Sequence, residues 1–391
     1  MSGESLRIGF IPLTDAAALM IAADKGFAAR QGLSLDLVRE VSWSNVRDKL
    51  NIGLFDAAHL LAPVAVASSL GIGHVKMPLL APFVLAANGN AITVSPALHS
   101  ALTLAAGGGD LADPKISSQA LVRVIIERRK RGADPLTFGM TFPLSCHNYL
   151  LRFWMAAGGV DPDEDVRLVV LPPPYMVDSL SSRQVDGFCV GAPWNSVAVE
   201  LGIGHILHFG SDIFARAPEK VLAVRAAWSA NRDDVLKRLV AALGQAADFL
   251  NNPDNLDEVV ALLAAPNRVA VAPEIIERTF KGRLRISPGG AFRTDPDYIL
   301  IGREGAARPE PAHAAWLYAQ MVRWRQAPLS PDFLAAAKAC FRPDIYDLSL
   351  GASAGLSATR SDKIRAFTGP PFDANDIAGH VAALQAELKN R

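Results

Sequence analysis

The stretch Leu6-Arg-Ile-Gly-Phe-Ile-Pro-Leu-Thr-Asp15 decides the fold, because it has the pattern of a strand that leads into the start of a helix. Apolar residues dominate from Leu6 to Ile11, as is typical of a buried strand. A helix is then expected to begin at Thr14 or Asp15 and to bury the run Ala16-Ala-Ala-Leu-Met-Ile-Ala-Ala23. The chain therefore opens with a strand followed by a helix.

The following segments continue this alternation. Leu33 to Val38 alternates like a strand, Ser44 is expected to cap a helix that runs to about Gly53, and Ala57 to Ala62 is an apolar strand. An order of strand, helix, strand, helix, strand predicts a parallel sheet with helices on both faces.

The same pattern recurs in the middle of the chain. Phe138-Gly-Met-Thr-Phe-Pro143-Leu-Ser matches Ile8-Gly-Phe-Ile-Pro12-Leu-Thr apart from one extra residue, and 186–193 matches 56–63. Pro12 and Pro63 are 51 residues apart, and Pro143 and Pro193 are 50 apart. Two unrelated α/β units could share such turns by chance, but the kept spacing favours two related lobes. Beyond residue 225, apolar periodicity predicts helices within 235–249, 256–263 and 312–322.

Composition narrows the class of protein. The chain has 391 residues, enough for about two or three domains, and 39 basic residues balance 39 acidic ones, so no net charge attracts nucleic acid or anionic lipid. Three cysteines are too few for a disulfide scaffold. Residues 57–75 are apolar but are interrupted by proline and polar residues, which predicts no membrane span. The apolar run 8–13 is too short for a secretory signal, so a cytoplasmic protein is expected unless a signal has been removed.

No enzyme signature is present. The sequence has no G-x-S-x-G, P-loop or H-E-x-x-H motif, and its eight histidines show no metal-ligand spacing. Cys146 and His147 are adjacent, so on a helix their side chains point about 100° apart and do not form a nucleophile and base pair. His59 lies in an apolar strand and is expected to be a buried core histidine. No catalysis, metal or cofactor is expected.

The remaining candidates are polar residues at expected helix starts. Because the carboxyl ends of parallel strands share one edge of a sheet, these residues should gather between the lobes. Helix N-termini offer free N–H groups and partial positive charge, so two such edges facing each other suit a small oxyanion. The segments concerned are Thr14-Asp15, Trp43-Ser44, Ser145-Cys-His147 and Gly191-Ala-Pro-Trp194.

Five blocks, in order, resemble the nitrate-binding proteins of nitrate/bicarbonate ABC importers. Between about residues 6 and 285 they are WSNVRDKL from Trp43, DAAHLLAP from Asp56, NGNAITVS from Asn88, CHNYLLRFWMAAGGVDP from Cys146, and PPPYMV from Pro172 with VDGFCVGAPWN from Val185. The resemblance implies an α/β, periplasmic-binding-protein-like fold of type II, in which each lobe is a mostly parallel sheet flanked by helices. It places lobe I at 1–87 and 226–391, with extra C-terminal helices, and lobe II at 88–225.

The resemblance also implies a set of ligand-binding residues. They supply hydrogen-bond donors and one ammonium group to replace the water around a planar, singly charged anion. Bicarbonate carries a proton that needs an acceptor, for which the sequence shows no clear counterpart, so nitrate or nitrite is expected. The implied ligand residues are Trp43, Asn90, His147, Gly191 and Lys281, with Thr14, Ser145, Cys146 and Trp194 behind them.

Without a recognised signal, the chain is similar to cytoplasmic nitrate/nitrite sensors of the NasS type. In these proteins the ligand releases an RNA-binding antiterminator of the ANTAR class, the expected protein partner here. Three alternatives remain open: a periplasmic receptor of an importer, an enzyme of pyrimidine or thiamine metabolism on the same fold, and a receptor for sulfonates or other small organic anions.

Overall fold

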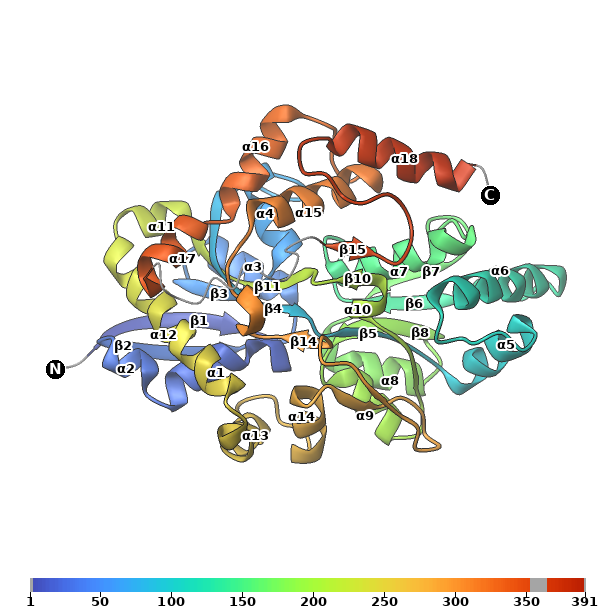
Figure 1. Cartoon of the computed structure of the whole chain (residues 1–391), viewed down its shortest axis with the longest axis horizontal. Helices are drawn as coiled ribbons and strands as arrows, with labels where there is room; N and C mark the ends of the chain where they lie inside the picture. The colour runs from blue at the N-terminus through green and yellow to red at the C-terminus, as the bar shows by residue number, and fades with distance from the viewer. Residues whose placement is uncertain (1–2, 352–363, 390–391) are drawn as a thin grey trace.

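The computed structural model describes residues 3–351 and 364–389, which form two α/β lobes side by side (Figure 1). The first lobe contains a six-stranded sheet in the order β14-β4-β11-β3-β1-β2. Its strands are β1 (Glu4–Phe10), β2 (Leu33–Arg39), β3 (Ala57–Leu61), β4 (Leu79–Asn88), β11 (Pro218–Arg225) and β14 (Ile299–Leu300).

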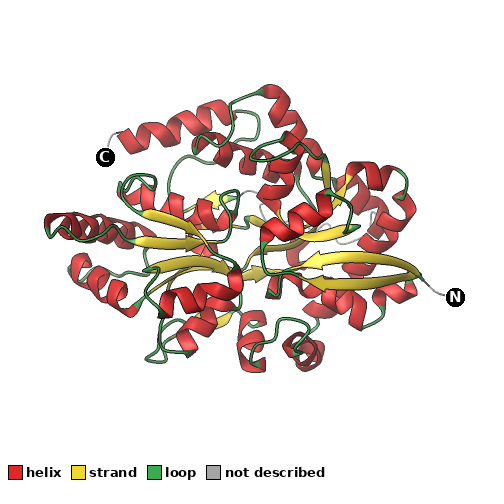
Figure 2. Cartoon of the chain, turned by 180° about the vertical axis from the view of Figure 1, so that it is seen from behind, coloured by secondary structure: helices red, strands yellow, loops and turns green. Residues whose placement is uncertain are grey.

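The second lobe contains a five-stranded sheet in the order β7-β6-β8-β5-β9. Figure 2 shows that both sheets extend to the middle of the molecule, with helices around them. The strands of this sheet are β5 (Asn90–Val94), β6 (Thr137–Met140), β7 (Arg167–Val170), β8 (Gly187–Gly191) and β9 (His205–Phe209).

Both sheets are mixed rather than mostly parallel, which corrects the expectation from sequence. β1 is parallel to β2 and β3, but β11 is antiparallel to β3 and β4. In the second lobe β6 is parallel to β7 and β8, whereas β5 is antiparallel to β8 and β9. The reason is the route of the chain: β5 and β11 arrive from the other lobe, so each enters its sheet at the edge where neighbouring strands end.

The crossings between the lobes lie at two short segments. β4 ends at Asn88 in the first sheet and β5 begins at Asn90 in the second, so the chain crosses at Gly89, which has a φ of +86°. The return lies just before Pro218, because β11 belongs to the first sheet. The boundary expected at residue 225 is therefore corrected. An apolar strand such as 221–224 suits either lobe, and sequence alone does not say which sheet it joins.

Helices cover both faces of the first sheet. α12 packs against α1, and α3 begins at Trp43, two residues earlier than a cap at Ser44 would place it. Its N-cap is Ser42 rather than Ser44, because the Ser42 hydroxyl accepts a hydrogen bond from the backbone N–H of Asn45 at 3.2 Å. The helical segments here are η1 (Thr14–Ala16), α1 (Ala17–Asp24), α2 (Phe27–Arg30), α3 (Trp43–Asn51), α4 (Ala62–Leu70), α11 (Ala226–Ala230), α12 (Asp233–Asn251), η3 (Pro253–Asn255), α13 (Leu256–Ala264), α14 (Pro273–Phe280), η4 (Arg303–Gly305) and α17 (Pro343–Leu350).

The second lobe is built around α7, which is buried along most of its length. α6 packs against both α7 and α5. The helical segments of this lobe are α5 (Pro96–Ala106), α6 (Pro114–Lys130), α7 (Cys146–Gly158), η2 (Pro173–Tyr175), α8 (Met176–Ser181), α9 (Trp194–Glu200) and α10 (Gly210–Ile213).

The C-terminal part contacts both lobes. α15 (Pro311–Arg323) and α16 (Pro331–Cys340) pack on α4 of the first lobe, and the helix expected within 312–322 is thereby confirmed. The short strand β15 (Arg365–Ala366) pairs with β10 (Phe214–Ala215) on the second lobe, and α18 (Ile377–Lys389) packs against α15. The strands β12 (Arg283–Arg285) and β13 (Phe292–Thr294) form a hairpin that lies between α14 and β14 in the sequence.

Candidate functional site

Polar residues from both lobes meet where the two sheets face each other. The first lobe supplies Asp15 after β1, Trp43 at the start of α3, His59 from β3, and the neighbours Glu219 and Lys220 from β11; all five are at most 1% exposed. The second lobe supplies Asn90 from the start of β5, His147 from the first turn of α7 and Gly191 from the end of β8. We call these eight residues the interlobe cluster.

Lys220 is the centre of the cluster. Its ammonium nitrogen lies 3.0 Å from Asp15 Oδ2 and 2.8 Å from Glu219 Oε2. It also lies 5.4 Å from the centroid of the Trp43 ring, within cation–π range. A fully buried ammonium group needs such partners, because desolvation otherwise favours its neutral form. The two carboxylates raise the pKa of Lys220 despite burial, so Lys220 stays charged.

A local irregularity in β11 brings Glu219 and Lys220 to the same place. Successive side chains of a regular strand point to opposite faces, but the pairing of β11 with β4 shifts register on both sides of Lys220. A bulge of this kind redirects a side chain. Two consecutive residues of one strand can therefore both face the other lobe.

Asp15 and His59 form a second pair on the first lobe. His59 Nε2 lies 2.9 Å from Asp15 Oδ1, and His59 Nδ1 accepts the backbone N–H of Ile11 at 3.4 Å. Burial alone would raise the pKa of Asp15, but Lys220 and His59 lower it to about 2. Burial lowers the pKa of His59, although the negative charge of Asp15 acts to raise it. The pair is thus a carboxylate beside a neutral imidazole at neutral pH.

The second lobe presents His147 to Glu219. His147 Nε2 is 3.7 Å from Glu219 Oε2, and its Nδ1 is 3.0 Å from the Thr141 hydroxyl. Burial lowers the pKa of His147 to about 4, although Glu219 opposes this. Burial raises the pKa of Glu219, but Lys220, His147 and the nearby Asn90 outweigh it, so the pKa falls. Glu219 is therefore ionised and His147 neutral at neutral pH.

The lobes are closed over the cluster. The backbone N–H of Thr14 in the first lobe donates to the carbonyl of Ala192 in the second at 3.0 Å. Gly191 allows this approach, because a Cβ there would lie 3.3 Å from Asp15 Oδ2 and 3.5 Å from Asn90 Oδ1. A side chain at this position would crowd the Asp15 carboxylate across the interface.

Several buried polar atoms of the cluster have no hydrogen-bond partner among residues 3–351 and 364–389. Buried polar groups are normally paired, so several unpaired ones converging on one ammonium group are the signature of a small polar ligand. These atoms are Trp43 Nε1, both polar atoms of the Asn90 side chain, His147 Nε2 and Glu219 Oε1, and the neighbouring Thr14 Oγ1 is likewise unpaired.

The structure brings four of the expected ligand residues together: Trp43, Asn90, His147 and Gly191. Of the residues expected behind them, Thr14 joins the lobes, and Ser145 caps α7 by accepting the N–H of Asn148 at 3.1 Å. The Cys146 thiol donates to the carbonyl of Pro218 at 3.4 Å. Trp194 packs at the start of α9 in the second lobe.

Lys281 does not join the cluster, which corrects the expected source of the positive charge. It follows α14, its side chain is 53% exposed, and its ammonium group pairs with Glu277 one turn earlier at 2.5 Å. A surface i,i+4 pair of this kind stabilises a helix weakly. The buried ammonium is that of Lys220.

Sequence reasoning missed Glu219, Lys220 and the roles of Asp15 and His59. Glu219-Lys220 followed by the apolar run Val-Leu-Ala-Val224 offered a signal, because a charged pair inside a buried strand must have partners. His59 is buried as expected, but it is bonded to a carboxylate of the cluster. Glu219 is also an ionised carboxylate whose Oε1 has no hydrogen-bond partner among the described residues, a hydrogen-bond acceptor that the sequence did not reveal.

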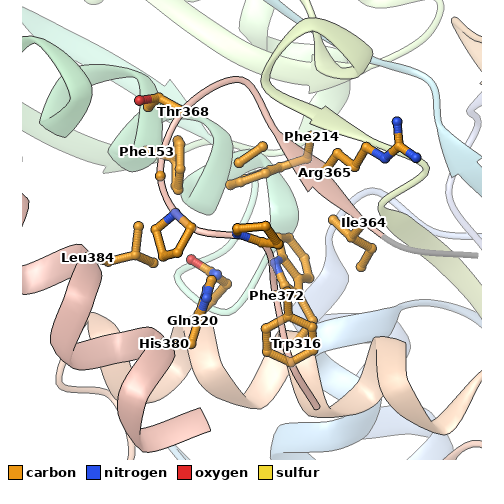
Figure 3. A pocket seen from close by; sticks show the side chains of 14 residues that line it. Phe153, Phe214, Trp316, Gln320, Ile364, Arg365, Thr368, Phe372, His380 and Leu384 are labelled. Atoms are coloured by element: carbon orange, nitrogen blue, oxygen red, sulfur yellow. The ribbon is translucent and has the colours of Figure 1, made fainter. Parts of the chain in front are cut away.

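A separate cavity of about 230 Å³ lies beneath the C-terminal segment (Figure 3). Its lining includes the aromatic rings of Phe153 and Phe214 from the second lobe and Trp316 from α15, and it shares no residue with the interlobe cluster. Among the described residues, no group of three His, Cys, Asp or Glu side chains is arranged to hold a metal ion. The described helices also include none long and apolar enough to cross a bilayer.

Two lobes closed over a buried polar cluster define a solute-binding protein of the periplasmic-binding-protein-like class. The NMT1-like family model matches residues 2–264. The crystal structure of the periplasmic nitrate-binding protein NrtA from Synechocystis superposes with a TM-score of 0.86 at 27% identity, and the match covers 98% of both chains. The chain belongs to the NMT1-like family of NrtA-like substrate-binding proteins, and its expected fold is confirmed.

Curated relatives are found in nitrate and bicarbonate import. The nitrate/nitrite binding protein NrtA of Nostoc is 31% identical over 328 residues, which cover 82% of this chain and 71% of that protein. The nitrate import ATP-binding protein NrtC of Synechocystis is 31% identical over 385 residues, which cover 96% of this chain but 54% of that protein. The chain thus spans about half the length of such ATP-binding relatives.

Proposed function

We propose that the chain binds nitrate or nitrite between its lobes and releases it unchanged. The observation that carries this proposal is the buried ammonium of Lys220 beside the unpaired atoms Trp43 Nε1 and His147 Nε2. Charge-assisted hydrogen bonds from such donors suit a small, singly charged oxyanion. The proteins named as nitrate/nitrite binding among the relatives support the same ligand.

The site does not supply the chemistry that an enzyme would need. Cys146 is the cysteine nearest to a histidine in sequence, but burial raises the pKa of its thiol well above the ordinary value, and Glu219 raises it further. A thiol that stays protonated is a poor nucleophile. We therefore assign Cys146 a packing role and give the chain no catalytic activity.

Calorimetric titration with nitrate, nitrite, bicarbonate and a short alkanesulfonate tests the proposed ligand. Nitrate or nitrite should bind most tightly, and the bound anion should raise the melting temperature, because a ligand of the folded state stabilises it. A protein that is folded but gives neither heat nor a thermal shift with nitrate and nitrite would refute the proposal. Tighter binding of bicarbonate would move the assignment to the bicarbonate branch of the relatives.

We further propose that this binding serves a cytoplasmic sensor whose partner is an antiterminator of the ANTAR class. Relatives that are import ATP-binding proteins contain a region similar to this chain, which supports a use of the fold other than as a free receptor. The anion contacts both lobes only in the closed form, so binding shifts the population toward closure. A partner that prefers the open form would then dissociate, and by linkage it would weaken anion binding by the same factor.

A periplasmic receptor of an importer is the second candidate, because the NrtA crystal structure superposes over nearly the whole chain. Purification from the native cell separates the two. A sensor should copurify with an RNA-binding regulator and lose it on gel filtration in millimolar nitrate. A chain recovered from the periplasm without such a partner would refute the sensor and support the receptor.

A further inference from the structure

The charges of the interlobe cluster do not balance for an anionic ligand. Asp15 and Glu219 carry two negative charges, Lys220 carries one positive charge, and both imidazoles are neutral. The cluster therefore has one surplus negative charge before an anion arrives. A nitrate ion would double that surplus among side chains that are at most 1% exposed, where solvent screens charges poorly.

His59 cannot remove this imbalance. Its Nε2 already faces Asp15 Oδ1 at 2.9 Å, so the proton of the neutral ring is there. Its Nδ1 accepts the backbone N–H of Ile11. A second proton on Nδ1 would oppose that N–H donor, and β3 is too well packed to turn the ring away.

His147 has the contacts needed to accept a proton. Its Nδ1 lies 3.0 Å from the Thr141 hydroxyl, which can either donate or accept, so a charged ring keeps this bond. Its Nε2 lies 3.7 Å from Glu219 Oε2 and has no hydrogen-bond partner among the described residues. The charged groups that act on the ring are Glu219 and Lys220 from β11 and Asp15 from η1, and the buried thiols of Cys146 and Cys189 are neutral.

We infer that nitrate or nitrite enters this site together with one proton, which His147 holds. The imidazolium then donates from Nε2 to the anion or to Glu219, and the cluster keeps the charge that it has without ligand. The low pKa of His147 without ligand means that this proton is absent near neutral pH and must be taken up.

This inference rests on the proposed nitrate or nitrite function, and proton uptake can be measured directly. Calorimetry at pH 7 in Tris and in HEPES should give binding heats that differ by the ionisation heats of the buffers, with uptake approaching one proton per anion. Because binding is linked to one proton, nitrate affinity should fall as the pH rises from 6.5 to 8.5, by at most about tenfold per pH unit.

Two variants locate the proton. His147→Gln should bind nitrate more weakly and with affinity independent of pH. Glu219→Gln removes the surplus charge, so it should lose the uptake and bind nitrate more tightly than the unchanged protein at pH 8.5. His99→Gln is the matched control, because His99 stacks on His205, outside the cluster, and should leave the uptake unchanged.

The outcomes separate the two proposals. Nitrate binding with equal heats in both buffers and no pH dependence refutes the proton while leaving the nitrate function intact. Uptake that persists in His147→Gln refutes His147 as its holder. A folded protein that binds neither nitrate nor nitrite removes both proposals together.

Discussion

The ammonium group of Lys220 shows how strongly a single buried charge depends on its neighbours. It is fully buried and is held by Asp15 and Glu219 at hydrogen-bond distance. Removing one partner of a buried charge pair is far more costly than losing a surface pair, because the remaining charge has no water to solvate it. We therefore expect Lys220 to be required both for the fold around the cluster and for the proposed anion binding.

Replacing Lys220 tests the source of the positive charge. Lys220→Met should abolish measurable nitrate binding and lower the melting temperature, since Asp15 and Glu219 then face each other without a cation. Lys281→Ala is the matched control and should change the affinity by less than about twofold, as expected of an exposed pair. Calorimetry and thermal unfolding measure both effects. An unaffected Lys220→Met protein would exclude Lys220 as a ligand.

Trp43 allows a milder test, because its N–H can be removed while most of the ring remains. Trp43→Phe should stay folded and bind nitrate more weakly by about 1.5–3 kcal/mol, the range for a hydrogen bond to a charged group. Trp228→Phe is the control, because the Trp228 N–H donates to Asp56 at 3.0 Å, outside the cluster. Calorimetric titration of both variants with nitrate measures the difference in affinity. Equal affinities would show that the Trp43 N–H does not reach the anion.

Among the elements, β11 and α7 place the buried ammonium group, its neighbour Glu219 and the histidine that faces Glu219. β11 carries Glu219 and Lys220 from the edge that faces the second lobe, and α7 holds His147 in its first turn. The sequence predicted α7 and its residues because Ser145 is a clear cap before an apolar run. The bulge in β11 escaped prediction because it depends on pairing with β4, which lies far away in sequence.

The difference between local sequence patterns and long-range strand pairing also explains which other features could be predicted. The alternation of strands and helices and the division into two lobes follow from local patterns, and the family resemblance pointed to Trp43, Asn90, His147 and Gly191, which the structure brings together. The direction of β11, the sheet it joins and the choice of Lys220 over Lys281 depend on long-range pairing. Local sequence does not encode long-range partners in a form that a residue pattern reveals.

The cap of α3 provides a test at the level of an element, because this helix presents Trp43. Ser42→Ala removes the hydroxyl that accepts the N–H of Asn45 and should reduce the free energy of unfolding by about 1 kcal/mol. Ser44→Ala, at the position expected from sequence, should have little effect. Denaturant unfolding of both variants measures the difference. The reverse result would show that Ser44 caps the helix.

In the whole molecule, ion pairs outside the cluster also join the lobes. Arg278 from α14 and Arg285 from β12 both pair with Glu200 at the end of α9, at 2.5 and 2.9 Å. Arg293 of β13 pairs with Asp212 of α10, and the Ser211 hydroxyl donates to Asp295 at 2.5 Å. The segment 278–295 thus fastens the first lobe to the second and favours closure.

Loosening this attachment should weaken anion binding without touching the cluster. Glu200→Gln removes two partly exposed pairs worth about 0.2–1 kcal/mol each, so the nitrate affinity should fall by about fivefold, mainly through faster dissociation. Glu127→Gln is the control, because Glu127 pairs with Arg131 within α6. Stopped-flow and calorimetric measurements test both. An unchanged dissociation rate would show that the pair does not restrain opening.

Buried histidines should make the folded protein sensitive to mild acid. Burial lowers the pKa of His147 to about 4 and that of His208 to about 3, and it also lowers that of His59. In the unfolded chain these groups bind protons near pH 6.5, so the unfolded state takes up more protons below that value. The free energy of unfolding should therefore be steady above pH 6.5 and should fall as the pH decreases toward 4. Urea unfolding at several pH values measures this, and a flat profile would contradict it.

The C-terminal part adds a third link, because α15 and α16 rest on the first lobe while β15 pairs with β10 on the second. Two neighbouring crossings alone would allow the lobes to twist as well as to bend. The C-terminal part is attached to both lobes at a distance from the two crossings, so it resists twisting. The lobes should therefore rotate about a single hinge axis. Each such movement would also shift the C-terminal part against one lobe. Binding of the proposed anion would thereby change a surface far from the interlobe cluster.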